Sequence, residues 1–278
     1  MNKNQIFKKG STTYYFSSVF FPKSVRDDVF TLYAFVRTAD DYVDQIPQDV
    51  LGFLEFKNKT HKALEGLKSQ NPIIDDFVML ANRKKFENKW TEAFLDSMES
   101  DMKVRKYETF SDLEKYIYGS ADVIGLMMAR IMDLPEKSLS TAQLLGKSMQ
   151  FINFIRDIRE DLDLGRVYMP QDDIKKFGLS ENLSDLSENK IGFENFIRYQ
   201  IAKYKIITKE AEKGFAYIPP RLRASIMTAN DMYKWTAKTI EKSPQIILEK
   251  KVKPSPIFVL VTYFKNLLLS HLENQKAI

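Results

Sequence analysis

Carboxylates gather in the segment FVRTADDYVD, which is otherwise rich in apolar side chains. Tyr33, Arg37, Asp40 and Asp44 follow one another at intervals of four, three and four residues. Residues three or four apart share one face of an α-helix, so both aspartates border the apolar stripe. Like charges at this spacing destabilise an isolated helix unless solvent or cations compensate them. The pattern is typical of a solvated helix face or of a cation-binding cavity wall.

A second segment, QFINFIRDIREDLDLGRVYMP, repeats the pattern. Gln150, Asn153, Asp157 and Asp161 follow one another at intervals of three, four and four residues. Isoleucines and a leucine hold the neighbouring stripe, and Gly165 can end the helix in the left-handed conformation. We call these two sets of polar residues the first and second ladders. They are predicted to face each other across a helical bundle.

Paired carboxylates of this kind suit Mg²⁺-assisted departure of a diphosphate. Mg²⁺ takes oxygen ligands and usually binds through one or two carboxylates together with substrate phosphate oxygens, and Mn²⁺ accepts similar ligands. Bound ions would neutralise the diphosphate as its carbon–oxygen bond breaks, without a protein nucleophile. Arg37, Arg156 and Arg166 are predicted to add forked contacts to phosphate.

The elements that position these residues are predicted to be helices throughout. Apolar residues recur at helical spacing, no segment alternates with period two, and about ten helices fit typical lengths. The first ladder falls on a helix that Pro22 can open. Helix breaks are expected at Asn71–Pro72, 134–138, 164–170, 218–220 and 253–256. None of these breaks is long enough for an interdomain linker, so residues 1–278 are predicted to form a single all-α domain.

Composition narrows the class of protein. The chain has 278 residues, of which 44% are hydrophobic, and it has no cysteine, which excludes disulfides and thiolate chemistry. The net charge is +5, yet no basic run is dense enough to predict a nucleic-acid partner. No secretory leader pattern opens the sequence, so a cytoplasmic location is expected.

At four motifs the chain resembles the squalene and phytoene synthase family of head-to-head prenyl transferases, and its phytoene synthase branch in particular. The motifs are STTYYFSSVFFP at 11–22, LYAFVRTADDYVD at 32–44, YIYGSADVIGLMM at 116–128 and NFIRDIREDLDLGRVYMPQDDI at 153–174. The resemblance implies an all-α bundle of the isoprenoid synthase type that encloses a central cavity. One departure is Asp122, which follows Ala121 where the family's phytoene synthases often carry Ala-Gly.

The resemblance also assigns roles to residues. Metal and diphosphate binding falls to Asp40, Asp44, Asp157 and Asp161, with Asn153 as a further metal ligand. Residues that touch the diphosphate or flank the reacting carbons are Tyr33, Arg37, Tyr107, Arg156 and Tyr233, and Gln150 matches a polar cavity residue beside the second motif. On the turn that follows this motif, Arg166 and Tyr168 are further substrate-binding candidates. Ser18 matches a position that is bulky and aromatic in enzymes making the shorter dehydrosqualene. A small residue there implies a longer tunnel for the prenyl tail.

The implied reaction joins two geranylgeranyl diphosphates through prephytoene diphosphate to phytoene, with Mg²⁺ and without NADPH. Squalene or dehydrosqualene synthesis from farnesyl diphosphate is the alternative within the same class. A non-catalytic assembly factor on the same scaffold is the alternative of another class. Such a factor is expected to have lost the ladder carboxylates, and this chain keeps them.

The C-terminal segment 256–272 is apolar but is interrupted by Lys265. It is too short and too polar to span a bilayer. We expect a helix of the bundle, with an apolar lip that rests on a membrane as the alternative. The sequence leaves the oligomeric state open.

Overall fold

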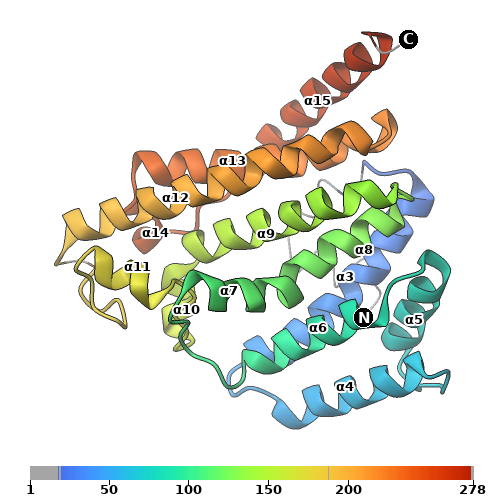
Figure 1. Ribbon diagram of the computed structural model, residues 1–278, viewed down its shortest axis with the longest axis horizontal. Helices are drawn as coiled ribbons and strands as arrows, with labels where there is room; N and C mark the ends of the chain where they lie inside the picture. Colours follow the sequence, from blue (N-terminus) through green and yellow to red (C-terminus); the bar gives the residue numbers. More distant parts are fainter. Residues whose placement is uncertain (1–17, 19, 187, 277–278) are drawn as a thin grey trace.

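The computed structural model describes residues 18, 20–186 and 188–276, and in this part of the chain the regular elements are helices without a β-strand (Figure 1). The all-α prediction is therefore confirmed. The helices are α3 (Lys23–Asp44), α4 (Val50–Leu64), α5 (Pro72–Lys84), α6 (Asn88–Ser100), α7 (Phe110–Ile117), the π-helix η1 (Tyr118–Asp122), α8 (Val123–Ile131), the short 3₁₀ turn η2 (Glu136–Ser138), α9 (Leu139–Arg156), α10 (Ile158–Asp163), α11 (Gln171–Lys176), α12 (Lys190–Glu212), the 3₁₀ turn η3 (Lys213–Tyr217), α13 (Pro220–Lys242), α14 (Ile246–Glu249) and α15 (Pro256–Lys276).

Helix boundaries agree with the predicted breaks. Asn71 caps α5 by accepting a hydrogen bond from the backbone N–H of Ile73, and Pro72 occupies the first turn, where its missing N–H leaves no bond unmade. Gly165 has a φ of +69°, the left-handed conformation expected after the second ladder. Local sequence chemistry is sufficient to set these ends.

One expected helix is broken. The second ladder was predicted to lie on a continuous helix, but α9 ends at Arg156 and α10 starts at Ile158, with Asp157 between them at φ −100° and ψ 12°. Ile155 and Ile158 are both buried, so the apolar stripe continues across the kink. The hydrophobic pattern in the sequence therefore does not predict the kink. The hydrogen bonds from Asp157 N to Asn153 O and from Asp161 N to Asp157 O persist at 2.8 and 2.9 Å.

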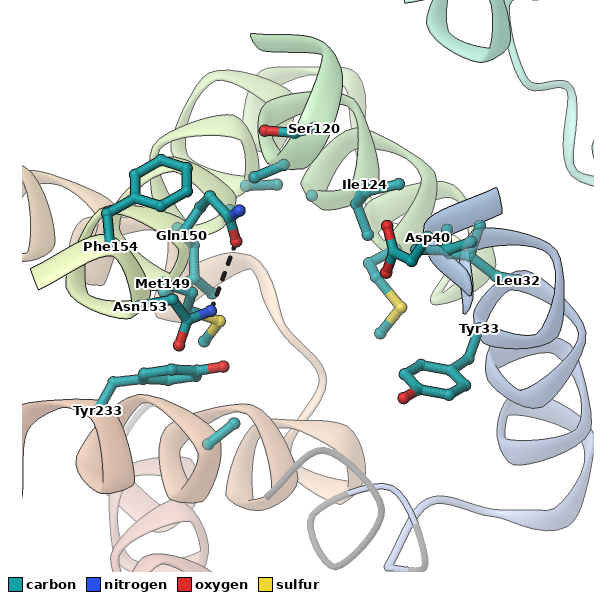
Figure 2. A pocket seen from close by; sticks show the side chains of 18 of the residues that line it. Leu32, Tyr33, Asp40, Ser120, Ile124, Met149, Gln150, Asn153, Phe154 and Tyr233 are labelled. Carbon is teal, nitrogen blue, oxygen red and sulfur yellow. Dashed lines mark hydrogen bonds between the residues drawn. The ribbon is translucent and has the colours of Figure 1, made fainter. Parts of the chain in front are cut away.

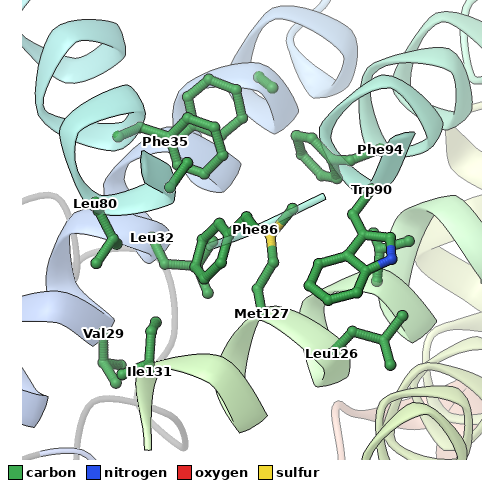
Figure 3. Close-up of a cluster of buried hydrophobic side chains, with 14 of the residues drawn as sticks. Val29, Leu32, Phe35, Leu80, Phe86, Trp90, Phe94, Leu126, Met127 and Ile131 are labelled. Atoms are coloured by element: carbon green, nitrogen blue, oxygen red, sulfur yellow. The ribbon is translucent and has the colours of Figure 1, made fainter. Parts of the chain in front are cut away.

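Two hydrophobic cores flank the centre of the bundle. The first packs α3, α5, α6 and α8 around a cluster of aromatic side chains that includes Phe35, Phe86 and Trp90 (Figure 3). Phe35 also stacks on Phe77, with ring centroids 3.8 Å apart. The second packs α9 against α12 and α13. Helix α8 of the first core and α9 of the second lie side by side in the middle of the bundle (Figure 1). The central cavity takes its walls from helices of both cores.

Close helix packing shapes one wall of that cavity. A Cβ atom on Gly125 would lie 2.2 Å from the carbonyl oxygen of Ala142, and one on Gly146 would lie 2.3 Å from that of Ala121. Only glycine therefore lets α8 and η1 approach α9 so closely. This contact holds the motif at 116–128 against α9, which carries the first two residues of the second ladder, Gln150 and Asn153.

Helix α15 packs against α13, and its far end projects beyond the bundle (Figure 1). Val259 and Asn266 are buried in this contact, whereas Val261 and Phe264 are more than half exposed. The helix is thus part of the bundle on one side only. Among the described residues, none of the helices combines the length and apolarity needed to cross a membrane.

Candidate active site

A cavity of about 560 Å³ lies between the two cores and receives side chains from both ladders. Figure 2 shows Asp40 and Tyr33 reaching into it from α3, Gln150 and Asn153 from α9, and Tyr233 from α13. The hydroxyl groups of Tyr33 and Tyr233 point inward from opposite sides. Residues far apart in the sequence are therefore brought to one enclosed space.

The first ladder borders this cavity as its spacing predicted. Tyr33, Arg37, Asp40 and Asp44 all line it, and all lie on α3. The adjacent Asp41 does not line the cavity: it is exposed and forms an ion pair with Arg37 at 2.6 Å. The structure thus separates two neighbouring carboxylates into one that faces the cavity and one that faces solvent.

The second ladder lines the same cavity. Gln150, Asn153, Asp157 and Asp161 all contribute to its wall. Asn153 Nδ2 donates a hydrogen bond to Gln150 Oε1 at 3.4 Å, which orients both amides (Figure 2). The kink at Asp157 leaves both aspartates at the cavity.

One aspartate in each ladder has a strongly raised pKa. Burial and the neighbouring Asp44 raise the pKa of Asp40 to about 8. Burial and the neighbouring Asp157 raise the pKa of Asp161 to about 8. In the described part of the chain, neither Asp40 nor Asp161 has a basic partner within ion-pair distance. Arg37 and Arg166 offset these shifts only in part, so both carboxylates fit cation ligands.

The other two ladder carboxylates are paired with basic side chains. Arg166 Nη1 lies 2.9 Å from Asp44 Oδ1. Arg156 holds Asp157 through two hydrogen bonds of 2.7 and 2.5 Å. Arg37, Arg156 and Arg166 all line the cavity, as expected for groups that contact a phosphate.

Asp101 is a cavity residue that sequence reasoning missed. It follows α6, is 4% exposed, and accepts hydrogen bonds from Tyr116 OH at 2.6 Å and Tyr168 OH at 2.7 Å. Burial raises the pKa of Asp101 to about 6, although both phenols oppose this shift. A lone aspartate at a helix end carries no signal in the sequence, so only the fold identifies it.

Lys251 and Lys253 also line the cavity. Burial, with repulsion from Lys251 and Arg156, lowers the pKa of Lys253. Both lysines thus add positive charge to the wall that carries the second ladder.

Two further predicted residues, Ser18 and Tyr168, line the cavity, and both are buried. Tyr107, by contrast, was predicted to touch substrate, yet it is not among the lining residues. Its ring packs against those of Tyr168, with centroids 6.1 Å apart, and Tyr116, at 5.5 Å. Both of these rings line the cavity, so we correct the placement of Tyr107 to the aromatic cluster that supports them.

The donor set fits magnesium bound together with a substrate. Among the described residues, no three acidic, histidine or cysteine side chains stand close enough to hold an ion by themselves. Carboxylates that converge in pairs match the way Mg²⁺ binds, through one or two carboxylates and the oxygens of a phosphorylated ligand. The residues that would hold it are Asp40, Asp44, Asn153, Asp157 and Asp161.

The fold and the two aspartate ladders define an all-α protein of the isoprenoid synthase type. The chain belongs to the squalene/phytoene synthase family, whose model matches residues 7–257.

Relatives by sequence carry phytoene synthase names. The chain is 27% identical over 267 residues to 15-cis-phytoene synthase of Paracoccus sp., covering 92% of this chain and 86% of that protein. It is 28% identical over 250 residues to the 15-cis-phytoene synthase of Pantoea ananas, covering 85% and 80%.

Solved structures share the fold. A dehydrosqualene synthase in complex with ligand superposes with a TM-score of 0.87 at 22% identity, covering 98% of this chain and 95% of that one. The squalene synthase HpnC from Alicyclobacillus acidocaldarius gives 0.75 at 18% identity, covering 86% and 92%. At these identities the likeness supports the architecture alone.

Proposed function

We propose that the protein condenses two geranylgeranyl diphosphates head to head, through prephytoene diphosphate, to phytoene, with release of both diphosphates. The observation that carries this proposal is the convergence of both ladders on one cavity whose remaining wall is largely apolar. Relatives named phytoene synthase and the small, buried Ser18 support the longer substrate over farnesyl diphosphate.

The polar residues of the cavity take different roles in this reaction according to their chemistry. Arg37, Arg156 and Arg166 present forked donors that hold the diphosphates in place. Mg²⁺, when bound, supplies Lewis-acid neutralisation of the departing diphosphate. Asn153 and the Tyr233 hydroxyl lie where they can orient the reacting end of the prenyl chain (Figure 2).

The apolar part of the cavity protects the carbocations that such a reaction forms. Leu32, Ile124, Met149 and Phe154 face this space (Figure 2). Water excluded by such walls does not quench a cation, and an aromatic face also attracts positive charge. Loss of a proton from the final cation would then give phytoene without a reductant.

Product analysis tests the proposal directly. The purified protein is incubated with Mg²⁺ and either geranylgeranyl or farnesyl diphosphate, with and without NADPH, and the products are identified by mass spectrometry. We expect phytoene from geranylgeranyl diphosphate, unchanged by NADPH. A reduced product that forms only with NADPH assigns the protein to squalene synthesis, and no turnover of either substrate favours a non-catalytic role.

We also propose that the protein rests on a membrane surface through α15 while remaining otherwise in the cytoplasm. Ile257, Val261, Phe264 and Leu268 recur at helical spacing and are each more than half exposed. A face of this kind partitions into a lipid interface, and the net charge of +5 favours anionic lipid. Prenyl substrates and a hydrocarbon product would enter and leave through the same lipid.

A further inference from the structure

Positive charge is distributed unevenly over the second ladder. Asp157 receives two hydrogen bonds from Arg156, and Lys251 Nζ lies 3.3 Å from its Oδ1. Asp161, four residues on, has no basic partner within ion-pair distance in the described part of the chain. Arg156 and Lys251 thus both pair with Asp157, whereas neither of them pairs with Asp161.

Lys251 is the more exchangeable of the two cations. It also pairs with Glu160, and its side chain is 30% exposed, against 14% for Arg156. An ammonium group on a flexible four-carbon stem needs less free energy to change partners than a guanidinium group that makes two hydrogen bonds to one carboxylate. Lys251 lines the cavity, so its charge lies at the wall where a diphosphate would bind.

The backbone that carries Lys251 is held independently of its side chain. Arg159 Nη1 donates a hydrogen bond to the carbonyl oxygen of Leu248, which fastens α14 to α10. Val252, the next residue, is only 4% exposed and packs into the second core. The lysine side chain can therefore change its partner while the segment stays in place.

We propose that Lys251 is an exchangeable counterion: it neutralises Asp157 while the cavity holds no metal, and it moves to the diphosphate when a metal ion takes its place. This inference rests on the proposed function. A cation that approaches Asp157 must compete with the ammonium group, whereas a diphosphate offers that group new acceptor oxygens. Lys251 therefore lowers the affinity for a metal ion when no diphosphate is present. It raises the affinity for a diphosphate that binds together with the metal.

Binding measurements on Lys251→Met test this prediction without turnover. Mn²⁺ affinity is measured by electron paramagnetic resonance of the free ion, and affinity for inorganic pyrophosphate in saturating Mn²⁺ by calorimetry. We expect Mn²⁺ alone to bind about two- to fivefold more tightly, as for loss of a partly exposed ion pair. Pyrophosphate is expected to bind about five- to tenfold more weakly, because a charge-assisted contact is lost. A gain in Mn²⁺ affinity together with a loss in pyrophosphate affinity would indicate that Lys251 exchanges between the two partners.

Two matched variants separate exchange from support of the segment. Lys250→Met removes the adjacent, exposed charge, and Arg159→Met removes the fastening to Leu248. Both should leave the two affinities within about twofold of wild type. The inference would be overturned, with the proposed function left standing, if Lys251→Met changed neither affinity or changed both in the same direction. The same holds if Arg159→Met changed the two affinities in opposite directions, as expected for Lys251→Met. Wild type that binds neither probe would overturn the proposed function and the inference with it.

Discussion

Arg166 Nη1 lies 2.9 Å from Asp44 Oδ1, although the two residues are 122 positions apart in the sequence. Arg166 Nη2 also donates a hydrogen bond of 2.6 Å to the carbonyl oxygen of Val43. Tyr168, two residues on, donates to Asp101 at the end of α6. The turn after the second ladder is thereby anchored to the end of the helix that carries the first, which sets how the ladders face each other.

The cavity-facing aspartates should be essential, and the solvent-facing one should not. Asp40→Asn or Asp161→Asn is expected to lower kcat by about 10²–10³-fold, because a neutral amide binds a cation poorly and transition-state charge loses its compensation. Circular dichroism should show unchanged helical content. Asp41→Asn, the matched control, is expected to stay within about tenfold of wild type, because Asp41 does not line the cavity and its ion pair with Arg37 is largely exposed.

Removal of divalent metal by chelation should reproduce the effect of the two ladder variants. Full activity of wild type without metal, or of Asp40→Asn, would contradict the roles given to the ladders.

Ser18 should determine prenyl chain length. It is 1% exposed and lines the cavity, so Ser18→Phe places a ring where part of a prenyl tail would lie, with an overpacking penalty of about 1–3 kcal/mol. Wild type is expected to prefer geranylgeranyl over farnesyl diphosphate, and Ser18→Phe to narrow or reverse this preference in kcat/KM. Ser18→Ala should retain the wild-type ratio. Equal loss on both substrates would show that Ser18 does not contact the tail.

Asp122 should make stability depend on pH. It is 1% exposed, and burial raises its pKa to about 6 despite a hydrogen bond from Gln143 and the charge of Lys147 3.8 Å away. An aspartate in the unfolded chain titrates near pH 3.9, so the folded state holds the proton more tightly and stability falls as the pH rises from about 4 through 6. Asp122→Asn is expected to raise the free energy of unfolding by about 2–3 kcal/mol near neutral pH and to change it little near pH 4.

Urea denaturation at both pH values measures this difference. Asp96→Asn serves as the control, because its side chain is 69% exposed and pairs with Lys57 at the surface. It should change stability by no more than about 1 kcal/mol at either pH. A destabilised Asp122→Asn at neutral pH would mean that the ion pair with Lys147 outweighs burial.

The outer face of α15 should mediate contact with lipid. Replacing both Val261 and Phe264 with serine removes two exposed apolar side chains and is expected to weaken co-sedimentation with anionic phosphatidylglycerol vesicles by about tenfold or more. Leu67→Ser removes an apolar side chain of similar exposure between α4 and α5 and should have no effect. Equal vesicle binding by all three proteins would contradict a membrane role for α15.

Helix type, helix ends and both ladders were predictable because each depends on residues within a few positions of one another. Spacing of three and four places Asp40 and Asp44 on one face whatever the rest of the chain does. The same local chemistry placed the helix ends at Pro72 and Gly165. The kink at Asp157 escaped prediction because the apolar stripe passes through it unchanged.

Tertiary packing alone decided which further polar groups join the two ladders at the cavity. Asp101 and Lys251 reach the site from segments with no local motif. Tyr107 does not line the cavity and packs against the rings of Tyr116 and Tyr168 instead. Contacts between separate segments of the chain place all three residues. Local spacing determines which side chains share a helix face. The direction in which that face points depends on how whole helices pack, because burial of apolar surface is summed over the entire bundle and is not encoded in any one segment.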